Sequence, residues 1–188
     1  MYITNFSTKQ FTKFSSLISS DKPEDNASFF EKSGKIFGNK EIFFKLILLE
    51  EQFIGAVCSF NRLKNRSEEY RSVTDYLPVN RILSSPLIKE LHIYEYFFFS
   101  CCGYIYKELK NMERVGDFEF DLTENNWSEL KKLKEERRVQ EHGKEWFWGE
   151  ISRSNPPVPT RGDNHNFERN MILLDSIYNK IYEQFIRN

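Results

Sequence analysis

The sequence has little cysteine, no strong excess of either charge and no long uncharged apolar run. Its three cysteines, Cys58, Cys101 and Cys102, are too few for a disulfide framework and lack Cys-x-x-Cys spacing. We interpret Cys101 and Cys102 as buried small side chains. Residues 42–60 contain charges and residues 93–106 are too few for a bilayer span, which needs about 20 apolar residues. With no signal-peptide pattern, we expect a cytoplasmic protein without a membrane partner.

Charge is nearly balanced, whereas aromatic side chains are plentiful. The 188 residues include 27 basic and 28 acidic side chains, for a net charge of −1. Proteins that wrap duplex nucleic acid are usually clearly basic, so this balance argues against a broad DNA-binding surface but leaves room for a local cluster. The 18 Phe, 9 Tyr and 3 Trp supply much of a hydrophobic core, and the length predicts one domain.

One segment in the first half of the chain has the apolar period of a long α-helix. Between residues 39 and 65 apolar side chains recur at steps of three and four. They are Ile42, Leu46, Leu49, Phe53, Ala56, Val57, Phe60 and Leu63. Neighbouring apolar residues widen this stripe, so we expect the helix to be central. Gly55 weakens a helix, and we expect it to permit close helix–helix approach. The polar residues 66–80 are interpreted as a connection that can include a helical turn.

Two further long helices show stripes of the same spacing. One is predicted over residues 87–112, with Pro86 in a first-turn position and Gly116-Asp117 as the break. Its stripe consists of Leu87, Leu91, Tyr94, Phe98, Cys101, Ile105 and Leu109. The other follows a capping residue at Asn166. Its stripe consists of Phe167, Met171, Leu174, Ile177, Tyr178, Ile181 and Phe185.

A more polar helix is predicted between these two. Thr123 or Asn125 can cap it and Gly143 can end it, and its polarity favours the surface or a wet groove. Short helices are expected over residues 7–19 and 29–38. The fold class is therefore all-α, a bundle of about four long helices plus short N-terminal helices. We expect one domain over residues 1–188, with short helices in 7–38 and the bundle core in 39–188.

The segment Arg137-Arg138-Val139-Gln140-Glu141-His142 holds the candidate catalytic residues. Arginine grips phosphate at two points, and histidine can transfer protons near neutral pH. Arg138 and His142 share a helical face, whereas Arg137 and His142 lie about 140° apart unless the helix end tightens or unwinds. RNA carries its own nucleophile, the 2′-hydroxyl, so its cleavage needs no metal or cofactor. The alternative interpretation is a solvated charged helix with Glu–Arg pairs.

At this motif the sequence resembles the HEPN superfamily, whose signature is an Arg, often followed by a polar residue, and then a His after four to six residues. Arg137, Arg138 in the polar position and His142 match the version with four intervening residues. The resemblance implies an all-α bundle with metal-independent endoribonuclease activity. It implies His142 as general acid and base, Arg137 as the phosphate and transition-state clamp and Arg138 as a second phosphate contact. It also implies a homodimer in which two protomers pool their motifs.

Residues after this motif are candidates for substrate binding. Trp146 and Trp148 can stack on RNA bases, an interaction worth ~1–3 kcal/mol per base. The alternative is that both tryptophans belong to the core or to a partner interface. His165 lies in a donor-rich loop over residues 161–165, after the proline-containing residues 155–159, and can belong to a ligand lid or to a plain surface connection.

A metal site is the third kind of candidate. His92 and Glu95, three residues apart, can share a metal with Glu50 or Glu51 of the central helix. The alternative is a His–Glu hydrogen bond where helices pack. Three functions thus follow: a metal-independent ribonuclease or RNA-binding toxin or defence protein without cofactors, a non-catalytic helical module of the immunity or adaptor kind that binds a protein, and a metal-dependent hydrolase.

Overall fold

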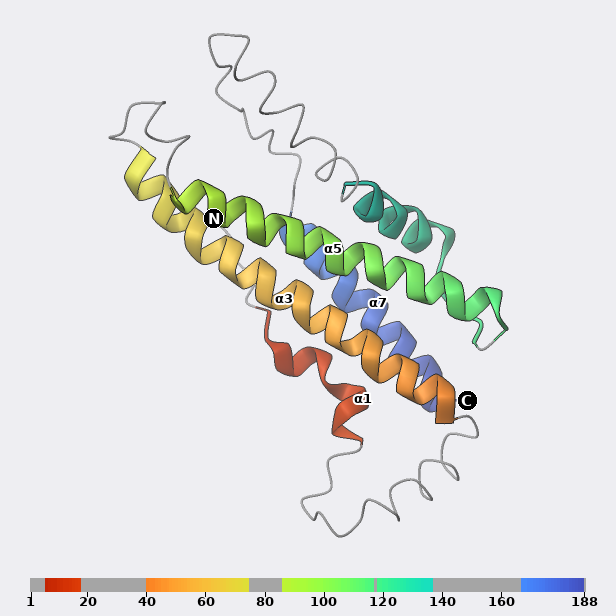
Figure 1. Cartoon of the computed structure of the whole chain (residues 1–188). Coiled ribbons are helices and arrows are strands. Elements are labelled where there is room, and N and C mark those ends of the chain that lie inside the picture. Colours follow the sequence, from red (N-terminus) through yellow and green to blue (C-terminus); the bar gives the residue numbers. More distant parts are fainter. Residues whose placement is uncertain (1–5, 18–39, 75–85, 117, 137–166, 188) are drawn as a thin grey trace.

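The described part of the chain is helical. The computed structural model describes residues 6–17, 40–74, 86–116, 118–136 and 167–187. They form the 3-10 helix η1 (Thr8–Phe11) and the α-helices α1 (Lys13–Ser16), α3 (Lys40–Thr74), α5 (Pro86–Arg114) and α7 (Phe167–Arg187), with a further helix over residues 124–136. No strand occurs in these residues (Figure 1). The expected all-α bundle is confirmed.

Helices α3 and α5 form an antiparallel hairpin in the middle of the molecule. Gly55 of α3 lies against Cys101 of α5, and Arg66 of α3 pairs with Glu90 of α5 at 2.8 Å between Nε and Oε2. Residue numbers therefore rise along one helix as they fall along the other. Helix α7 packs on one side of this hairpin, behind it in the view of Figure 1, while η1 and α1 also contact α3. Helix α3 is central, as its wide apolar stripe predicts.

The core lies between the hairpin and α7. All eight residues of the predicted α3 stripe are buried, with at most 8% of any side chain exposed. All seven residues of the predicted α7 stripe are also buried. On α5, Leu91, Phe98, Ile105 and Leu109 are buried and Tyr94 and Cys101 are half-buried, whereas the side chain of Leu87 lies outside the described atoms. The helical period of the sequence thus identified the inward faces of all three helices.

Helix α3 is longer than the sequence predicts. Residues 66–80 were expected to be a connection, yet α3 continues to Thr74. Residues 66–74 contain neither glycine nor proline, so nothing in them stops a helix that is already formed. The ion pair of Arg66 with Glu90 holds this end of α3 against α5.

The amino-terminal helix is divided, which corrects the expectation of one helix over residues 7–19. Ser7 caps η1 in a capping box with Gln10, and the chain then leaves helical geometry at Thr12, where φ is −122° and ψ is 25°. Phe11 and Phe14, on either side of this break, are both buried, whereas Leu17 is 40% exposed. The helix predicted over residues 29–38 lies outside the described residues.

The helix over residues 124–136 is joined closely to its neighbours. Thr123 caps it, as predicted, because the N–H of Asn126 donates to Thr123 Oγ1 at 3.2 Å. Asn126 Oδ1 in turn accepts from Thr123 Oγ1 and from Lys180 Nζ of α7. Gly116, where the sequence predicts a break after α5, has a φ of 76°, a conformation that favours glycine.

None of the described helices combines the length and apolar character that a membrane span requires. Charged side chains recur along both long helices of the hairpin, including Glu50 and Glu51 of α3 and Glu90 and Glu95 of α5. The expectation that residues 42–60 and 93–106 do not span a bilayer is therefore confirmed for the described helices.

Candidate functional site

The residues of the predicted ribonuclease site lie outside the described residues. They are Arg137, Arg138, His142, Trp146, Trp148 and His165. The helix over residues 124–136 is described up to the position directly before Arg137. The convergence of Arg137 and His142 therefore stays a prediction, as do the roles of the two tryptophans and of His165.

Glu50, a candidate metal ligand by sequence, is a buried carboxylate that anchors the amino-terminal segment. Its side chain is 2% exposed. Its Oε1 accepts the backbone N–H of Phe14 at 2.8 Å, and its Oε2 accepts that of Ser15 at 2.9 Å. Tyr178 of α7 donates its hydroxyl hydrogen to Oε1, and the same hydroxyl oxygen accepts the N–H of Lys13 at 2.7 Å. The first N–H groups of α1 thus have side-chain partners from α3 and α7.

This arrangement joins α1, α3 and α7 through hydrogen bonds. Both carboxylate oxygens of Glu50 are engaged, which is how a buried carboxylate avoids the cost of lost hydration. Burial, followed by the hydrogen bond to Glu50, raises the pKa of Tyr178 above its ordinary range. The hydroxyl therefore stays protonated and bridges α3 and α1. Sequence spacing gave no signal for this contact, because Glu50 and Tyr178 are 128 residues apart.

The other candidate metal ligands are not gathered around Glu50 in the described structure. Glu51 is exposed, while Glu95 of α5 is 7% exposed. The side chain of His92 lies outside the described atoms. Among the described residues no three His, Cys, Asp or Glu side chains form a group that could hold a metal ion. The metal-dependent hydrolase stays a prediction from sequence.

The three cysteines have different environments. Cys102 is buried, Cys101 is half-buried and Cys58 is exposed. Burial, and then the nearby Cys58, raise the pKa of the Cys101 thiol to about 11, and burial raises the pKa of Cys102 well above its ordinary value. The interpretation of Cys101 and Cys102 as small core side chains is confirmed for Cys102 and holds in part for Cys101.

A small open hollow of about 280 Å³ lies where the helix over residues 124–136 meets the start of α7. Its lining combines the polar residues Asn125, Asn170 and Ser176 with the apolar Ile172 and Leu173. Glu129 accepts a hydrogen bond from Lys132 and faces Arg169 at 3.6 Å. The hydrogen bond from Lys132 lowers the pKa of Glu129. The charges in this hollow are therefore already paired, which leaves it weakly suited to a charged ligand.

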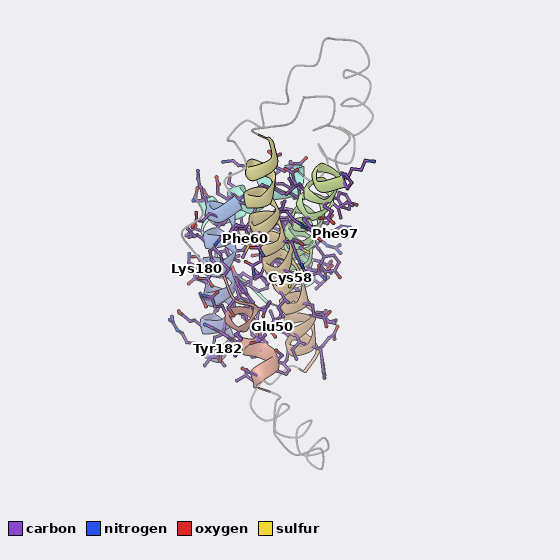
Figure 2. All side chains as sticks on the ribbon, turned by 90° about the vertical axis from the view of Figure 1, so that its left-hand side faces the viewer. Glu50, Cys58, Phe60, Phe97, Lys180 and Tyr182 are labelled. Atoms are coloured by element: carbon purple, nitrogen blue, oxygen red, sulfur yellow. The ribbon has the colours of Figure 1, made fainter. Side chains whose placement is uncertain are left out.

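The most distinctive exposed surface is the side of the α3–α5 hairpin that faces away from α7, which we call the outer face. On α3 it consists of Leu48, Glu51, Gly55, Cys58 and Arg62, and on α5 of Ile93, Phe97, Ser100, Tyr104 and Lys107. Both series alternate steps of three and four. Figure 2 shows Phe97 pointing away from the side where Lys180 and Tyr182 of α7 lie.

Large apolar side chains are conspicuous on the outer face. Leu48 is 58% exposed, Ile93 is 50% exposed, Phe97 is 51% exposed and Tyr104 is 44% exposed. The antiparallel register brings Cys58 level with Phe97 and places Leu48 about one turn from Tyr104. Leu48 and Tyr104 thus lie at one end of the outer face, and Phe97 and Ile93 lie towards the other end. The apolar period of α5 does not single out this surface, because α5 is apolar on both sides, although the alternating spacing is visible in the sequence.

Comparisons with known proteins give no further direction: no family model matches the chain, and no curated protein or solved structure shows significant similarity to it.

Proposed function

We propose that this protein is a helical interaction module that binds another polypeptide through the outer face. The observation that carries the proposal is a set of four half-exposed apolar side chains on two neighbouring helices. They are Leu48 on α3 and Ile93, Phe97 and Tyr104 on α5. Monomeric proteins rarely expose a continuous apolar surface larger than a few hundred Å², and such surfaces commonly mark interaction sites.

The spacing of the outer face suits a helical partner. Steps of three and four residues place side chains along one line of a helix, and two such lines side by side form ridges with a groove between them. A partner helix can lay its own apolar side chains into that groove. The aromatic Phe97 and Tyr104 suit the centre of such an interface, where aromatic residues contribute much of the binding energy.

The rest of the described structure holds this surface rigidly. Both helices have a buried face directly behind the outer face, including Phe53 and Val57 on α3 and Phe98 and Phe99 on α5. A surface backed by a packed core loses little conformational entropy on binding. High aromatic content and balanced charge, which the sequence shows, also suit this function.

The proposal is tested by partner capture with matched variants. The tagged protein, its Phe97→Glu variant and its Ile172→Glu variant are each used to capture proteins from the native host. Ile172 is 54% exposed on α7, so its substitution introduces the same charge outside the outer face. The wild type and Ile172→Glu should retain the same protein while Phe97→Glu loses it, at equal unfolding midpoints. An identical set of captured proteins from all three would contradict the proposal.

A second candidate function, a metal-independent ribonuclease, is supported by the sequence pattern Arg137-Arg138 followed by His142. In this hypothesis His142 accepts the proton of the RNA 2′-hydroxyl as its oxygen bonds to phosphorus, and a proton is returned to the leaving 5′-oxygen. Arg137 and Arg138 stabilise the charge on the pentavalent phosphate.

This second function has its own test. RNA is incubated with wild type, His142→Ala and the control variant Arg187→Ala, all with a metal chelator present. Cleavage by wild type and the control, together with its loss in His142→Ala at unchanged thermal stability, would support the hypothesis. Undiminished cleavage by His142→Ala would remove this residue from the mechanism.

A further inference from the structure

We infer that Cys58 of α3 and Cys101 of α5 together form a binding site for a soft monovalent metal ion, Cu(I), where the two helices approach each other at Gly55. Each helix supplies one thiolate ligand. The inference goes beyond the proposed function and does not depend on it, because the ion needs no partner polypeptide.

The close approach at Gly55 brings the Cys101 sulfur onto the surface of α3. Its Sγ lies 2.8 Å from the point that a Cβ atom at residue 55 would occupy. Cys58 is three residues further along α3. Residues with this spacing are neighbours on a helix, with Cβ atoms about 5–6 Å apart. The Cys101 sulfur therefore lies within about one helical turn of the Cys58 side chain.

The opposite directions of the two helices turn the thiols towards each other. Side chains of an α-helix lean towards its amino terminus. On α3 this lean carries the Cys58 thiol back over Gly55, which Cys101 contacts. On α5 it carries the Cys101 thiol towards the level of Cys58, because residue numbers fall along α5 as they rise along α3. Gly55 has no side chain to fill the space between them.

The electrostatics of Cys101 agree with this proximity. Burial is the main cause that raises the pKa of the Cys101 thiol to about 11, and the charge of Cys58 is the second. A like charge disfavours the ionised form of a group only when it is near. Two thiolates here repel each other, and a positive ion between the sulfurs removes that repulsion.

Two sulfur ligands select the kind of ion. Thiolates are soft ligands that favour Cu(I) and Zn²⁺. Structural Zn²⁺ almost always takes four ligands, whereas the described parts of the chain contain no group of three His, Cys, Asp or Glu side chains that could hold a metal. Cu(I) is satisfied by two thiolates on opposite sides of it. A pair of cysteines therefore fits Cu(I) and falls short of a zinc site.

Exposure and charge allow the ion to enter and to stay. Cys58 is exposed, so the ion arrives from solvent, while the half-buried Cys101 shelters one side of it. Each thiol releases one proton to water as its sulfur bonds to the metal, and coordination deprotonates even a thiol of raised pKa. Two thiolates with Cu(I) carry one net negative charge. Exposed Arg62, four residues after Cys58, places a positive charge on the same side of α3.

The first experiment is a titration of the full, reduced chain with the Cu(I)–bicinchoninate complex in the absence of oxygen. Loss of the colour of this complex reports transfer of Cu(I) to the protein. Wild type should take up one ion per chain, whereas Cys58→Ala and Cys101→Ala should each raise the dissociation constant at least about 100-fold. The matched control Cys102→Ala removes the buried neighbouring thiol and should bind like wild type. No uptake by wild type overturns the inference, and so does equal uptake by Cys101→Ala.

The second experiment uses wild type alone, so it does not depend on the folding of any variant. X-ray absorption of the Cu(I)-loaded protein should show two sulfur ligands and no nitrogen or oxygen ligand at the metal. A single sulfur ligand, or a nitrogen or oxygen ligand, would overturn the assignment to Cys58 and Cys101.

The metal site and the interaction module fail separately. Phe97→Glu keeps both sulfurs, so it should still take up one Cu(I). If Cu(I) does not bind but Phe97→Glu loses the captured protein, the metal site is wrong and the interaction module stands. If Cu(I) binds as expected but Phe97→Glu captures the same proteins as wild type, the module is wrong and the metal site stands.

Discussion

The hydroxyl group of Tyr178 on α7 donates to the buried carboxylate of Glu50 on α3, and together they hold the first turn of α1. The contact joins three segments that are far apart in the sequence, because Lys13 lies 165 residues from Tyr178. Both side chains are buried, since Glu50 is 2% exposed and Tyr178 is 1% exposed.

Removal of the Glu50 carboxylate should destabilise the protein. Glu50→Ala leaves the N–H groups of Phe14 and Ser15 and the Tyr178 hydroxyl without their acceptor, so we expect a loss of about 3 kcal/mol in the free energy of unfolding. The matched control is Glu51→Ala, next in the chain but exposed, which should change stability by less than about 0.5 kcal/mol. Urea denaturation measures the free energy of unfolding of both variants. Equal losses would contradict a stabilising role for the hydrogen bonds of Glu50.

Stability should fall in alkaline solution because of Tyr178. Burial, followed by the hydrogen bond to Glu50, raises the folded-state pKa of Tyr178 above its ordinary value of 10.0. Above that pH the unfolded chain releases a proton that the folded chain keeps, so stability is complete below pH 10 and falls above it, by up to about 1.4 kcal/mol per pH unit.

Tyr178→Phe is the comparison that isolates this effect. The pKa of Cys101 is raised from 9.0 to about 11, so this thiol also lowers stability between those pH values. Because it does so equally in both proteins, the difference between their free energies of unfolding reports on Tyr178 alone. The stability gap between wild type and Tyr178→Phe should narrow as pH rises beyond 10. A gap that stays constant with pH would show that the tyrosine ionises equally in both states.

The cysteines should differ in their rates of thiol modification. Cys58 is exposed, whereas a pKa of about 11 leaves Cys101 with a thiolate fraction of about one in a thousand at pH 8. Burial raises the pKa of Cys102 and also removes it from the reagent. A colorimetric disulfide reagent should therefore modify one thiol rapidly in the native protein and three in denaturant. The Cys58→Ser variant should lose the rapid phase, and its persistence would refute the assignment.

Gly55 should not tolerate a larger residue. A Cβ atom at Gly55 would lie 2.8 Å from Cys101 Sγ, closer than such atoms approach in proteins. Gly55→Ala should therefore destabilise the protein by about 1–2 kcal/mol, although alanine favours a helix by about 1 kcal/mol. Addition of Cys101→Ala should recover most of the loss in a double-mutant cycle. If the two substitutions change the free energy of unfolding independently, a clash between residue 55 and Cys101 is not the cause of the loss.

Periodicity in the sequence predicted the inward faces of the helices well. The α7 stripe from Phe167 to Phe185 was identified completely, because this helix is apolar on one side and polar on the other. Helix α5 is apolar on both sides, so its period revealed the stripe through Phe98 and concealed the second one through Phe97. The break at Thr12 was missed because it depends on Glu50, a residue of another helix.

The candidate sites were less predictable than the fold. Glu50 was one of several candidate metal ligands by its type and position, and its observed partners are backbone N–H groups and a tyrosine that no local spacing reveals. The pair Arg137 and His142 lies outside the described residues, so its geometry stays a prediction. Sequence spacing identifies residues that share one helix face, whereas a site built from several helices depends on how those helices pack.

The anchor of α1 also constrains the order in which the chain can assemble. During synthesis α7 leaves the ribosome after every other described element, and it carries the tyrosine that holds Lys13. Phe53 and Glu50 of α3 can contact the first described segment earlier, whereas the support from Tyr178 has to wait for α7. Nascent chains that stop before α7 should expose Phe14 to chaperones, because Tyr178, Tyr182 and Phe185, whose rings pack on it, have not yet been made.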